Sequence, residues 1–249
     1  MERLYRTEAL VLRHRPLGEA DRLVTLLTWE RGKLCAVARG ARKTKSKLAA
    51  GVDLFTHGYF ILYRGKTFPT ITGQEVKERF LHFRQDPDLY PYGLYLAELA
   101  DLLLEEEQPA PECCRLLAAA WRLLGEGVDR ALLSRAFELK LMSAIGYRPH
   151  LEGCLSCGDP EATLFSPRQG GLLCPSCSGG EGMGLEKGTL SLARHLLNTP
   201  LEQIKAVRST RLQKAELDQA FTAFLSCQLD INRLKSRPIL KFMEEKREG

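Results

Sequence analysis

The stretch EALVLRHRPLGEADRLVTLLTWERGKLCAVARG, residues 8–40, contains three apolar runs of strand length. The first two runs, EALVLRH and RLVTLLTW, are separated by a segment in which Pro16 and Gly18 favour a turn. The third, GKLCAVARG, follows the short WERG connection. Some of these runs have apolar residues on both faces of the strand, as in Leu23–Leu27. This pattern suits a small barrel whose outside packs against further structure.

Two more runs complete about five strands within residues 1–80. They are YFILYRGK, residues 59–66, and TITGQEV, residues 70–76. Short strands at this spacing are typical of a small barrel or a sandwich. Periodicity does not choose between the two, because it does not show whether the sheet closes.

Beyond residue 80 the hydrophobic period changes to that of helices. Tyr92, Leu96, Leu99 and Leu103 share one face, and prolines follow in LLEEEQPAPE. Four further helices are predicted over residues 111–125, 129–146, 186–198 and 211–235. The predicted architecture is a basic β domain, residues 1–80, and a helical domain, residues 81–249, with an insertion at about 150–182.

The insertion carries four of the eight cysteines. Cys154 and Cys157, and Cys174 and Cys177, form two C-x2-C pairs with sixteen residues between them. Two thiolates on one tight turn can face the same metal ion, and two such turns complete a tetrahedral site. We therefore predict one structural zinc ion, with two disulfides or a redox motif as alternatives. The other four cysteines are expected to be buried, unreactive thiols.

Positive charge is concentrated in the β domain. Residues 1–79 contain 16 Lys and Arg against 8 Asp and Glu, whereas the remaining 170 residues contain 20 against 23. Five cations fall within nine positions of one predicted loop, namely Arg39, Arg42, Lys43, Lys45 and Lys47. A cationic loop that leaves a strand of a small barrel is typical of proteins that follow a nucleic-acid backbone. The alternative is a basic surface that is merely solvated.

Further cations extend the predicted DNA-binding surface. Arg13, Arg15 and Lys33 lie near the basic loop in the predicted β domain. A second cluster near the end of the chain, in NRLKSRPILKF, contains Arg233, Lys235 and Arg237. Cations just after a helix also suit its dipole without any ligand, so both interpretations of the second cluster remain open.

Catalytic motifs are lacking in the sequence. It contains no P-loop, no G-x-G-x-x-G after a strand, no H-E-x-x-H and no nucleophile elbow. The adjacent Glu105, Glu106 and Glu107 are interpreted as a solvated helix end. No apolar run approaches the roughly 18 residues of a membrane helix, and the charged N-terminus does not resemble a signal peptide. We expect a cytoplasmic protein that is not an enzyme.

Taken together, these motifs resemble the bacterial RecO family of recombination mediators. The run from Glu8 to Lys47 is similar to that family's N-terminal pattern, including a G-E-x-D turn and a T-x-x-x-G-K-L step. GYRPHLEGCLSCG and LLCPSC match the zinc knuckles of many members, and LKSRPIL is similar to the family's C-terminal tail. The resemblance covers essentially the whole chain.

The resemblance implies a fold, an activity and partners. The fold is α+β and multidomain, with an N-terminal five-stranded OB-fold barrel and a helical domain that carries the inserted zinc module. The implied activity is binding of single- and double-stranded DNA and annealing of complementary strands. The implied partners are RecR, the recombinase RecA and single-strand-binding protein SSB, through the acidic C-terminal tail of SSB. A nucleoid-associated location follows from this role.

Two rival functions stay open at this point. OB-like domains and cysteine knuckles also recur in RNA-binding and translation-related proteins, which would prefer RNA in competition. A nuclease is the other rival, although the sequence shows no carboxylate cluster of a metal-binding type.

Overall fold

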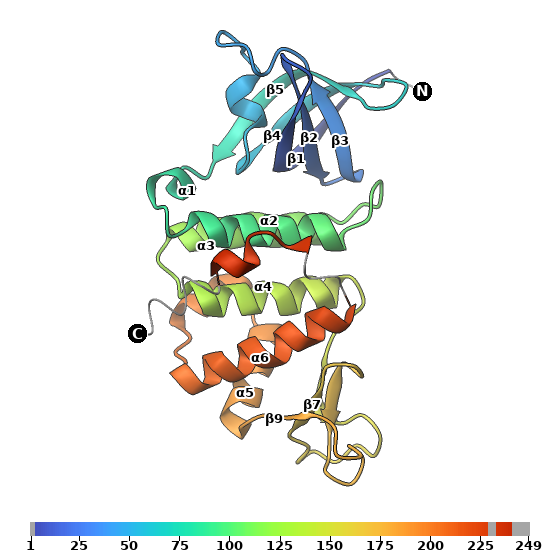
Figure 1. Ribbon diagram of the computed structural model, residues 1–249, viewed down its shortest axis with the longest axis vertical. Helices are drawn as coiled ribbons and strands as arrows, with labels where there is room; N and C mark the ends of the chain where they lie inside the picture. The colour runs from blue at the N-terminus through green and yellow to red at the C-terminus, as the bar shows by residue number, and fades with distance from the viewer. Residues whose placement is uncertain (1–2, 229–232, 241–249) are drawn as a thin grey trace. The chain divides into compact units, whose positions relative to one another are not determined.

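The structure is a computed structural model that describes residues 3–228 and 233–240 (Figure 1). The chain divides into two compact units. Unit 1 comprises residues 1–125 together with residues 235–249, and unit 2 comprises residues 126–234. The predicted boundary near residue 80 stays a proposal, and the division by compactness falls later because three helices pack with the β domain.

The β domain of unit 1 is a closed five-stranded barrel. Its strands are β1 (Leu4–Leu17), β2 (Asp21–Thr28), β3 (Gly32–Ala38), β4 (Thr56–Tyr63) and β5 (Thr70–Arg79). They are arranged in the order β1-β2-β3-β5-β4, and β4 pairs with β1 to close the barrel. All neighbours are antiparallel except β3 and β5, which meet in parallel at Val37 and Thr70. Closure confirms the barrel and excludes the sandwich.

Strands β1 and β2 are buried on both faces. Ala9, Val11, Val24 and Leu26 belong to the core of the barrel. Between them along the same strands, Leu10, Leu12, Leu23 and Leu27 point to the opposite face and are also almost completely buried. The outer face of these strands therefore packs against other elements, as the sequence predicts.

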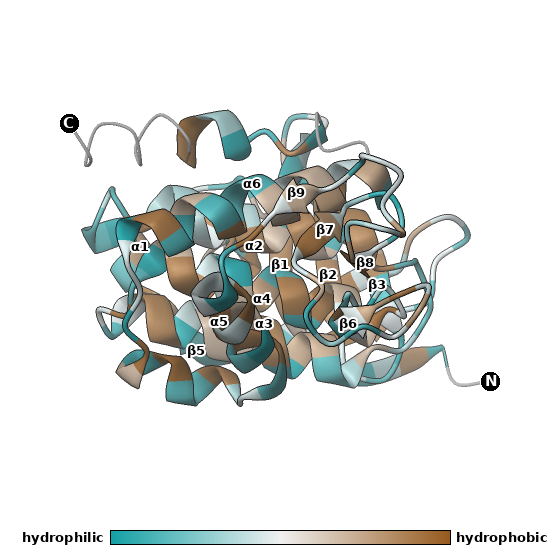
Figure 2. Ribbon diagram, turned by 90° about the horizontal axis from the view of Figure 1, so that it is seen from below, coloured by the Kyte–Doolittle hydropathy of each residue, from teal (hydrophilic) through white to brown (hydrophobic). Residues whose placement is uncertain are grey.

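Helices of unit 1 provide that cover. They are α1 (His82–Gln85), α2 (Tyr90–Leu103) and α3 (Pro111–Gly125), and both α2 and α3 pack against β1. Trp121 of α3 is fully buried, and its indole N–H donates to the Gly93 carbonyl oxygen at 3.1 Å. The buried residues of α3 are apolar, and Figure 2 draws apolar residues in brown and polar residues in teal.

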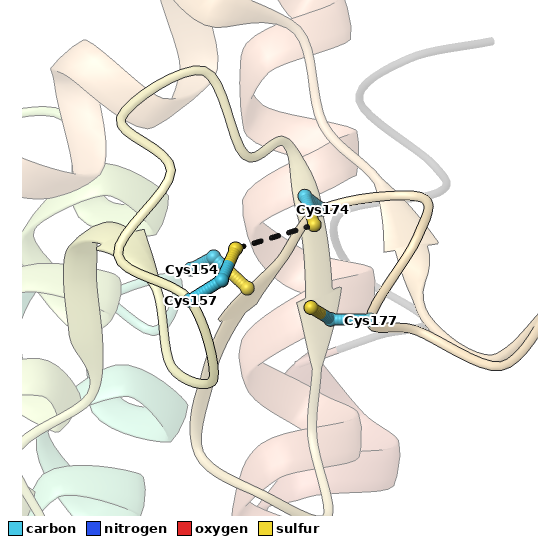
Figure 3. A group of neighbouring side chains, drawn as sticks. All are labelled: Cys154, Cys157, Cys174 and Cys177. Carbon is cyan, nitrogen blue, oxygen red and sulfur yellow. Dashed lines mark hydrogen bonds between the residues drawn. The ribbon is translucent and has the colours of Figure 1, made fainter.

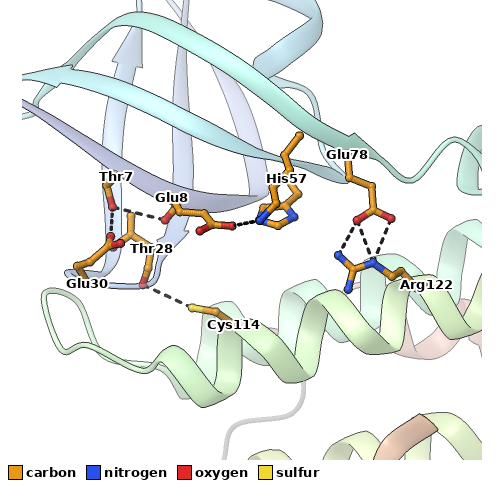
Figure 4. Close-up of polar contacts among 9 residues, drawn as sticks. Thr7, Glu8, Thr28, Glu30, His57, Glu78, Cys114 and Arg122 are labelled. Carbon is orange, nitrogen blue, oxygen red and sulfur yellow. Dashed lines mark hydrogen bonds and ion pairs between the residues drawn. The ribbon is translucent and has the colours of Figure 1, made fainter.

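A layer of polar contacts lies at the end of the barrel that meets the helices (Figure 4). His57 Nε2 lies 2.7 Å from Glu8 Oε1, and the ring of Trp29 stacks on the His57 ring with centroids 5.1 Å apart. Arg122 of α3 forms an ion pair with Glu78 of β5 at 2.6 Å. The buried His57 ring needs such a partner, because water no longer solvates it, whereas Arg122 and Glu78 are partly exposed.

Unit 2 is a small helical bundle with a short sheet. Its helices are α4 (Arg130–Ala144), α5 (Lys187–Asn198) and α6 (Arg211–Gln228), with the 3-10 segment η2 (Leu201–Ala206) between the last two. The sheet has the order β6-β8-β7-β9, from β6 (His150–Cys154), β7 (Leu164–Ser166), β8 (Gly171–Leu173) and β9 (Met183–Gly184). The described part of the predicted helix over residues 211–235 is α6, and residues 229–232 lie outside the described residues.

Aromatic packing attaches the sheet of unit 2 to its helices. The ring of Phe165 on β7 lies 5.5 Å from the Phe221 ring and 5.9 Å from the Phe224 ring, both on α6. All three side chains are buried. The sheet that carries the cysteines is thus fixed to the bundle by apolar contacts.

After unit 2 the chain returns to unit 1. Ser236 is fully buried, and its backbone N–H and its hydroxyl both donate to Glu98 Oε2 of α2, at 2.9 and 2.7 Å. Leu240 is buried as well. The serine of the LKSRPIL tail therefore anchors this segment to α2. Among the described residues, no helix is long and apolar enough to cross a bilayer.

We expect unit 1 to lose stability in mild acid. Burial lowers the pKa of His14, His57 and His82 below 6.5, and for His57 this effect outweighs the opposing attraction of Glu8. The unfolded chain then binds more protons than the folded chain below pH 6.5, so the free energy of unfolding decreases as the pH falls. Thermal unfolding from about pH 7.5 to 5.5 measures this decrease.

The variant His57→Gln is the matched comparison. It removes one of the three titrating groups, so its melting temperature should depend less steeply on pH than that of the wild type. When the pH dependence of the variant's melting temperature is subtracted from that of the wild type, the contributions of groups present in both proteins cancel. Identical slopes would contradict the assignment of His57 as a contributor.

Candidate metal centre and nucleic-acid surface

The four cysteines of the C-x2-C pairs converge at one point of unit 2 (Figure 3). Their sulfur atoms all lie within 4.8 Å of one another, and Cys157 Sγ lies 3.7 Å from Cys174 Sγ. Cys154 and Cys174 are buried, whereas Cys157 is exposed and Cys177 is half-buried. Four sulfurs that converge in this way could hold one metal ion, which fits the chemistry of thiolate ligands.

Both pairs have the same backbone turn. The Gly158 N–H donates to the Cys154 carbonyl oxygen at 2.9 Å, and the Ser178 N–H donates to the Cys174 carbonyl oxygen at 3.0 Å. Gly158 adopts a positive φ of 78°, which a residue with a Cβ rarely adopts. The turn places the two sulfurs of a pair on the same side, as the spacing predicts. The separations between the sulfurs also show that all four thiols are free, without disulfides.

A thiolate at one cysteine of the cluster disfavours deprotonation of its neighbours. Backbone N–H groups of Cys157 and Cys174 lower the pKa of Cys154 to about 6, because they stabilise its thiolate. The sulfurs of Cys174 and Cys157 raise the pKa of Cys177 to about 12. Four thiolates therefore need a nearby cation to coexist. A divalent metal ion supplies that charge and releases protons as it binds.

The remaining cysteines differ in their environment. Cys113 and Cys114 on α3 are buried, and burial raises their pKa values to about 11 and about 12, so they are unreactive as predicted. Cys35 is half-buried on β3. Cys227 is exposed near the end of α6, so the prediction of burial is wrong for this residue. A helical position alone does not show which face it occupies.

The basic loop follows β3 and is fixed at both ends. At its start, Asp21 Oδ1 accepts a hydrogen bond from the Gly40 N–H at 2.7 Å, and Arg42 donates to the Gly18 carbonyl oxygen at 2.7 Å. At its end, Gln74 of β5 donates to the Lys47 carbonyl oxygen at 3.2 Å. The G-E-x-D turn of the sequence therefore holds the loop in place. These bonds hold the backbone of the loop at both ends.

All five cations of the loop are exposed. Within residues 3–228 and 233–240, no ion pair engages Arg39, Lys43, Lys45 or Lys47, whereas Arg42 is committed to the β1–β2 turn. The exposed Arg15 has no ion-pair partner within the same ranges either. An uncompensated group of cations on a fixed loop attracts polyanions.

Arg13 and Lys33 have a different environment. Both face Asp101 of α2, with Arg13 Nε at 2.5 Å and Lys33 Nζ at 3.3 Å from its carboxylate oxygens. The Lys33 side chain is only 12% exposed. Phosphate contact through Lys33 would compete with this pairing, so we assign it first to the packing of α2 against the barrel. Its role in DNA binding stays a prediction.

The C-terminal cations lie around the Ser236 anchor. Arg233 and Lys235 are exposed, and Arg237 is half-buried. The hydrogen bonds that fix the basic loop go to the β1–β2 turn, to Asp21 of β2 and to Gln74 of β5, and none of these bonds involves Lys235 or Arg237. The part of the C-terminal cations in DNA binding also stays a prediction.

The interpretation of Glu105–Glu107 as solvated is confirmed, because all three residues are exposed, but they lie beyond the end of the helix. Helix α2 ends at Leu103, and the Glu107 N–H donates to the Lys33 carbonyl oxygen of the barrel at 3.0 Å. Glu106 and Glu107 line a groove on unit 1, with Tyr5 and Arg31 among the other lining residues. No local sequence signal identifies this groove, because its walls come from distant parts of the chain.

We expect replacement of both Cys154 and Cys157 by serine to abolish metal binding. Two ligands are lost, and the turn that links β6 to the site loses its fixed point, so the melting temperature of unit 2 should fall by several degrees or more. Metal analysis and thermal unfolding measure the two effects. Cys227→Ser is the matched control, since Cys227 lies outside the cluster. Full metal content in the double variant would contradict the assignment.

Comparisons with known proteins agree with the resemblance. Two family models match the chain, Recombination protein O N terminal over residues 1–80 and Recombination protein O C terminal over residues 84–238. The relative named DNA repair protein RecO from Symbiobacterium thermophilum is 37% identical over 252 residues, which cover 98% of this chain and 99% of that protein.

Two further relatives carry the same name. The protein from Roseiflexus sp. is 40% identical over 229 residues, which cover 90% of this chain and 81% of the relative. The protein from Alkaliphilus metalliredigens is 35% identical over 243 residues, which cover 96% of this chain and 99% of the relative. With both family models matched and this identity over nearly its whole length, the chain belongs to the RecO family of recombination and DNA repair proteins.

Proposed function

We propose that this protein is a non-catalytic recombination mediator that binds single- and double-stranded DNA and anneals complementary strands. Membership of the RecO family supports a role in DNA repair and recombination. The observation that carries the DNA-binding proposal is the basic loop, with four exposed cations and no ion-pair partner for them among the described residues. Phosphate contacts of this kind bind DNA with little dependence on its sequence.

Annealing requires that two polyanions approach each other. Each strand repels the other, and a protein that neutralises phosphates on both strands increases their rate of encounter. We assign one contact surface to the basic loop with Arg15, and a second to the C-terminal cations Arg233, Lys235 and Arg237. No bond is made or broken in this process, so the function needs no catalytic group.

The proposed partners follow from the family. With RecR, the protein would help to load RecA onto single strands covered by SSB, and it would meet SSB through the acidic C-terminal tail of that protein. Addition of RecR should increase the rate at which RecA assembles on SSB-covered DNA, and the increase should require this protein.

We also propose that the four-cysteine site holds one structural zinc ion. A site closed by four sulfurs leaves no open position for a substrate, and tetrahedral thiolate ligation suits zinc. Its ligands come from the β6 and β8 ends of the short sheet, so the ion would join the two halves of that module.

The basic loop is tested by the salt dependence of DNA binding. In the variant, Arg39, Lys43, Lys45 and Lys47 are replaced by alanine, while Arg42 is kept because it anchors the loop. If all four cations contact phosphates, the slope of log affinity against log salt for a single strand decreases by up to about 2.8, since each contact contributes roughly 0.7. Binding to a labelled oligonucleotide at several salt concentrations measures the slope.

A matched control removes four exposed cations from unit 2, namely Arg168, Lys187, Lys205 and Arg208. The net charge changes by the same amount, but the slope should change little. Equal effects of the two variants would show that only the net charge matters. Stronger competition by single-stranded RNA than by DNA would contradict the proposed substrate.

The zinc proposal predicts one zinc ion per chain after purification without added metal. The variant without Cys154 and Cys157 should bind single-stranded DNA with nearly the affinity of the wild type at a temperature where both are folded, because the ion has no substrate role. Loss of DNA binding in a folded variant, or a redox-active iron in place of zinc, would contradict a purely structural zinc ion.

A further inference from the structure

The four cysteines of the C-x2-C pairs differ in their access to solvent. Cys154 and Cys174 are buried, Cys177 is half-buried, and Cys157 is exposed. Their sulfur atoms nevertheless all lie within 4.8 Å of one another. A reagent from solution therefore reaches Cys157 first, and the sulfur that it modifies lies next to the three others.

The exposed sulfur has a close neighbour on the opposite turn. Cys157 Sγ lies 3.7 Å from Cys174 Sγ, and the dashed line of Figure 3 joins this pair. Cysteines that respond reversibly to peroxides combine an accessible thiolate with a second thiol beside it, because the second thiol converts the first oxidation product into a disulfide. Cys157 and Cys174 meet both geometric conditions.

The sheet of unit 2 holds the two turns together through its backbone. Strands β6 and β8 pair in parallel, with Cys154 opposite Leu172. The Leu155 N–H donates to the Leu172 carbonyl oxygen at 2.8 Å, and the His150 N–H donates to the Gly170 carbonyl oxygen at 2.9 Å. None of these bonds involves a sulfur atom, so they remain when the sulfurs change their partners. A disulfide between the two turns is therefore compatible with the sheet, because neighbouring strands keep their side chains within reach of each other.

We propose that Cys157 is a modification site for hydroperoxides and that Cys174 completes the reaction, so that the cluster exchanges its metal ion for a disulfide between the two turns. Cysteine ligands of a metal ion are thiolates, and the thiolate is the form of cysteine that peroxides oxidise. This inference goes beyond the proposed function, because it concerns the cluster alone and does not depend on DNA binding.

The reaction has two steps. In the first, the Cys157 thiolate attacks one oxygen of the hydroperoxide, so that an S–O bond forms, the O–O bond breaks, and the departing hydroxide or alkoxide takes a proton from water. In the second, the Cys174 thiolate attacks the Cys157 sulfur, so that the S–S bond forms, the S–O bond breaks and hydroxide leaves. The two sulfurs lose two electrons in total, and the peroxide gains them. Only two cysteine ligands then remain for the metal ion, so its affinity for the site decreases.

Simple oxidative damage makes a different prediction. Without a partner sulfur, the oxidation of Cys157 would continue to the sulfinic and sulfonic acids, which a thiol reductant does not reverse. A disulfide is reduced by dithiothreitol, and the four thiols can then bind zinc again. The position of the disulfide and its reversal by a reductant therefore separate the two reactions.

The test treats the full zinc-loaded chain with hydrogen peroxide, and it measures the rate of zinc release and the position of disulfides by mass spectrometry. The variant Cys157→His keeps a fourth ligand, because three cysteines and one histidine also bind zinc, but it cannot form the disulfide. It should release zinc about tenfold more slowly than the wild type, since its accessible thiolate is absent. The matched control is Cys177→His, which makes the same replacement at the half-buried ligand and should release zinc at nearly the wild-type rate. Cys227→Ser removes an exposed thiol outside the cluster and should leave the rate unchanged.

The oxidised wild type should contain a disulfide between Cys157 and Cys174, and dithiothreitol should restore its capacity for zinc. Equal release rates of the two histidine variants, a disulfide within one turn, or oxidation that dithiothreitol does not reverse would overturn the proposal. If neither histidine variant bound zinc, the position of the disulfide in the wild type would still decide the question. A purified protein without zinc would contradict the proposed zinc ion instead, and the disulfide of the oxidised chain would still test Cys157 and Cys174.

Discussion

The rest of unit 1 depends on the burial of both faces of β1 and β2. One face of these strands contributes Val11 and Val24 to the core of the barrel, and the other exposes Leu10 and Leu27 unless something covers it. Each such leucine gains about 1.5–3 kcal/mol from complete burial, so an uncovered outer face would be costly. Helices α2 and α3 supply the cover, and the barrel and its helices consequently form one compact unit.

This cover determines which cations remain available to a ligand. Other basic residues of unit 1 form ion pairs with carboxylates. Asp101 of α2 pairs with Arg13 and Lys33. Asp53 pairs with Arg22 and with Arg84 of α1. Such pairs compensate the loss of hydration at partly buried positions. The loop after β3 has no helix over it and no acid opposite it among the described residues. Basic residues next to the helices thus stabilise the packing of unit 1 through ion pairs, whereas those of the loop are available to a ligand.

The sequence is informative where the signal is local. Alternation predicts the five strands, and the C-x2-C spacing predicts convergence of Cys154, Cys157, Cys174 and Cys177, because each pair lies on its own turn. The strands β7 and β9, of three and two residues, are too short to show a period. The hydrogen bond between Ser236 and Glu98 joins residues 138 positions apart, and the position of Glu107 depends on the hydrogen bond from its N–H to the Lys33 carbonyl oxygen. Contacts of such long range leave no pattern in a local window.

The bond between Ser236 and Glu98 also affects the order in which the protein can be completed during synthesis. Unit 1 is discontinuous, since its first 125 residues leave the ribosome well before the segment that contains Ser236 and Leu240. Contacts between distant parts of a chain form late, because both partners must be present and the intervening chain must close. Unit 2 can pack from its own residues in the meantime, whereas Glu98 of α2 has no hydrogen bond from Ser236 until that residue is synthesised. A nascent chain that stops before residue 236 would therefore leave Glu98 without this partner, even though both the barrel and the cysteine module had been fully translated.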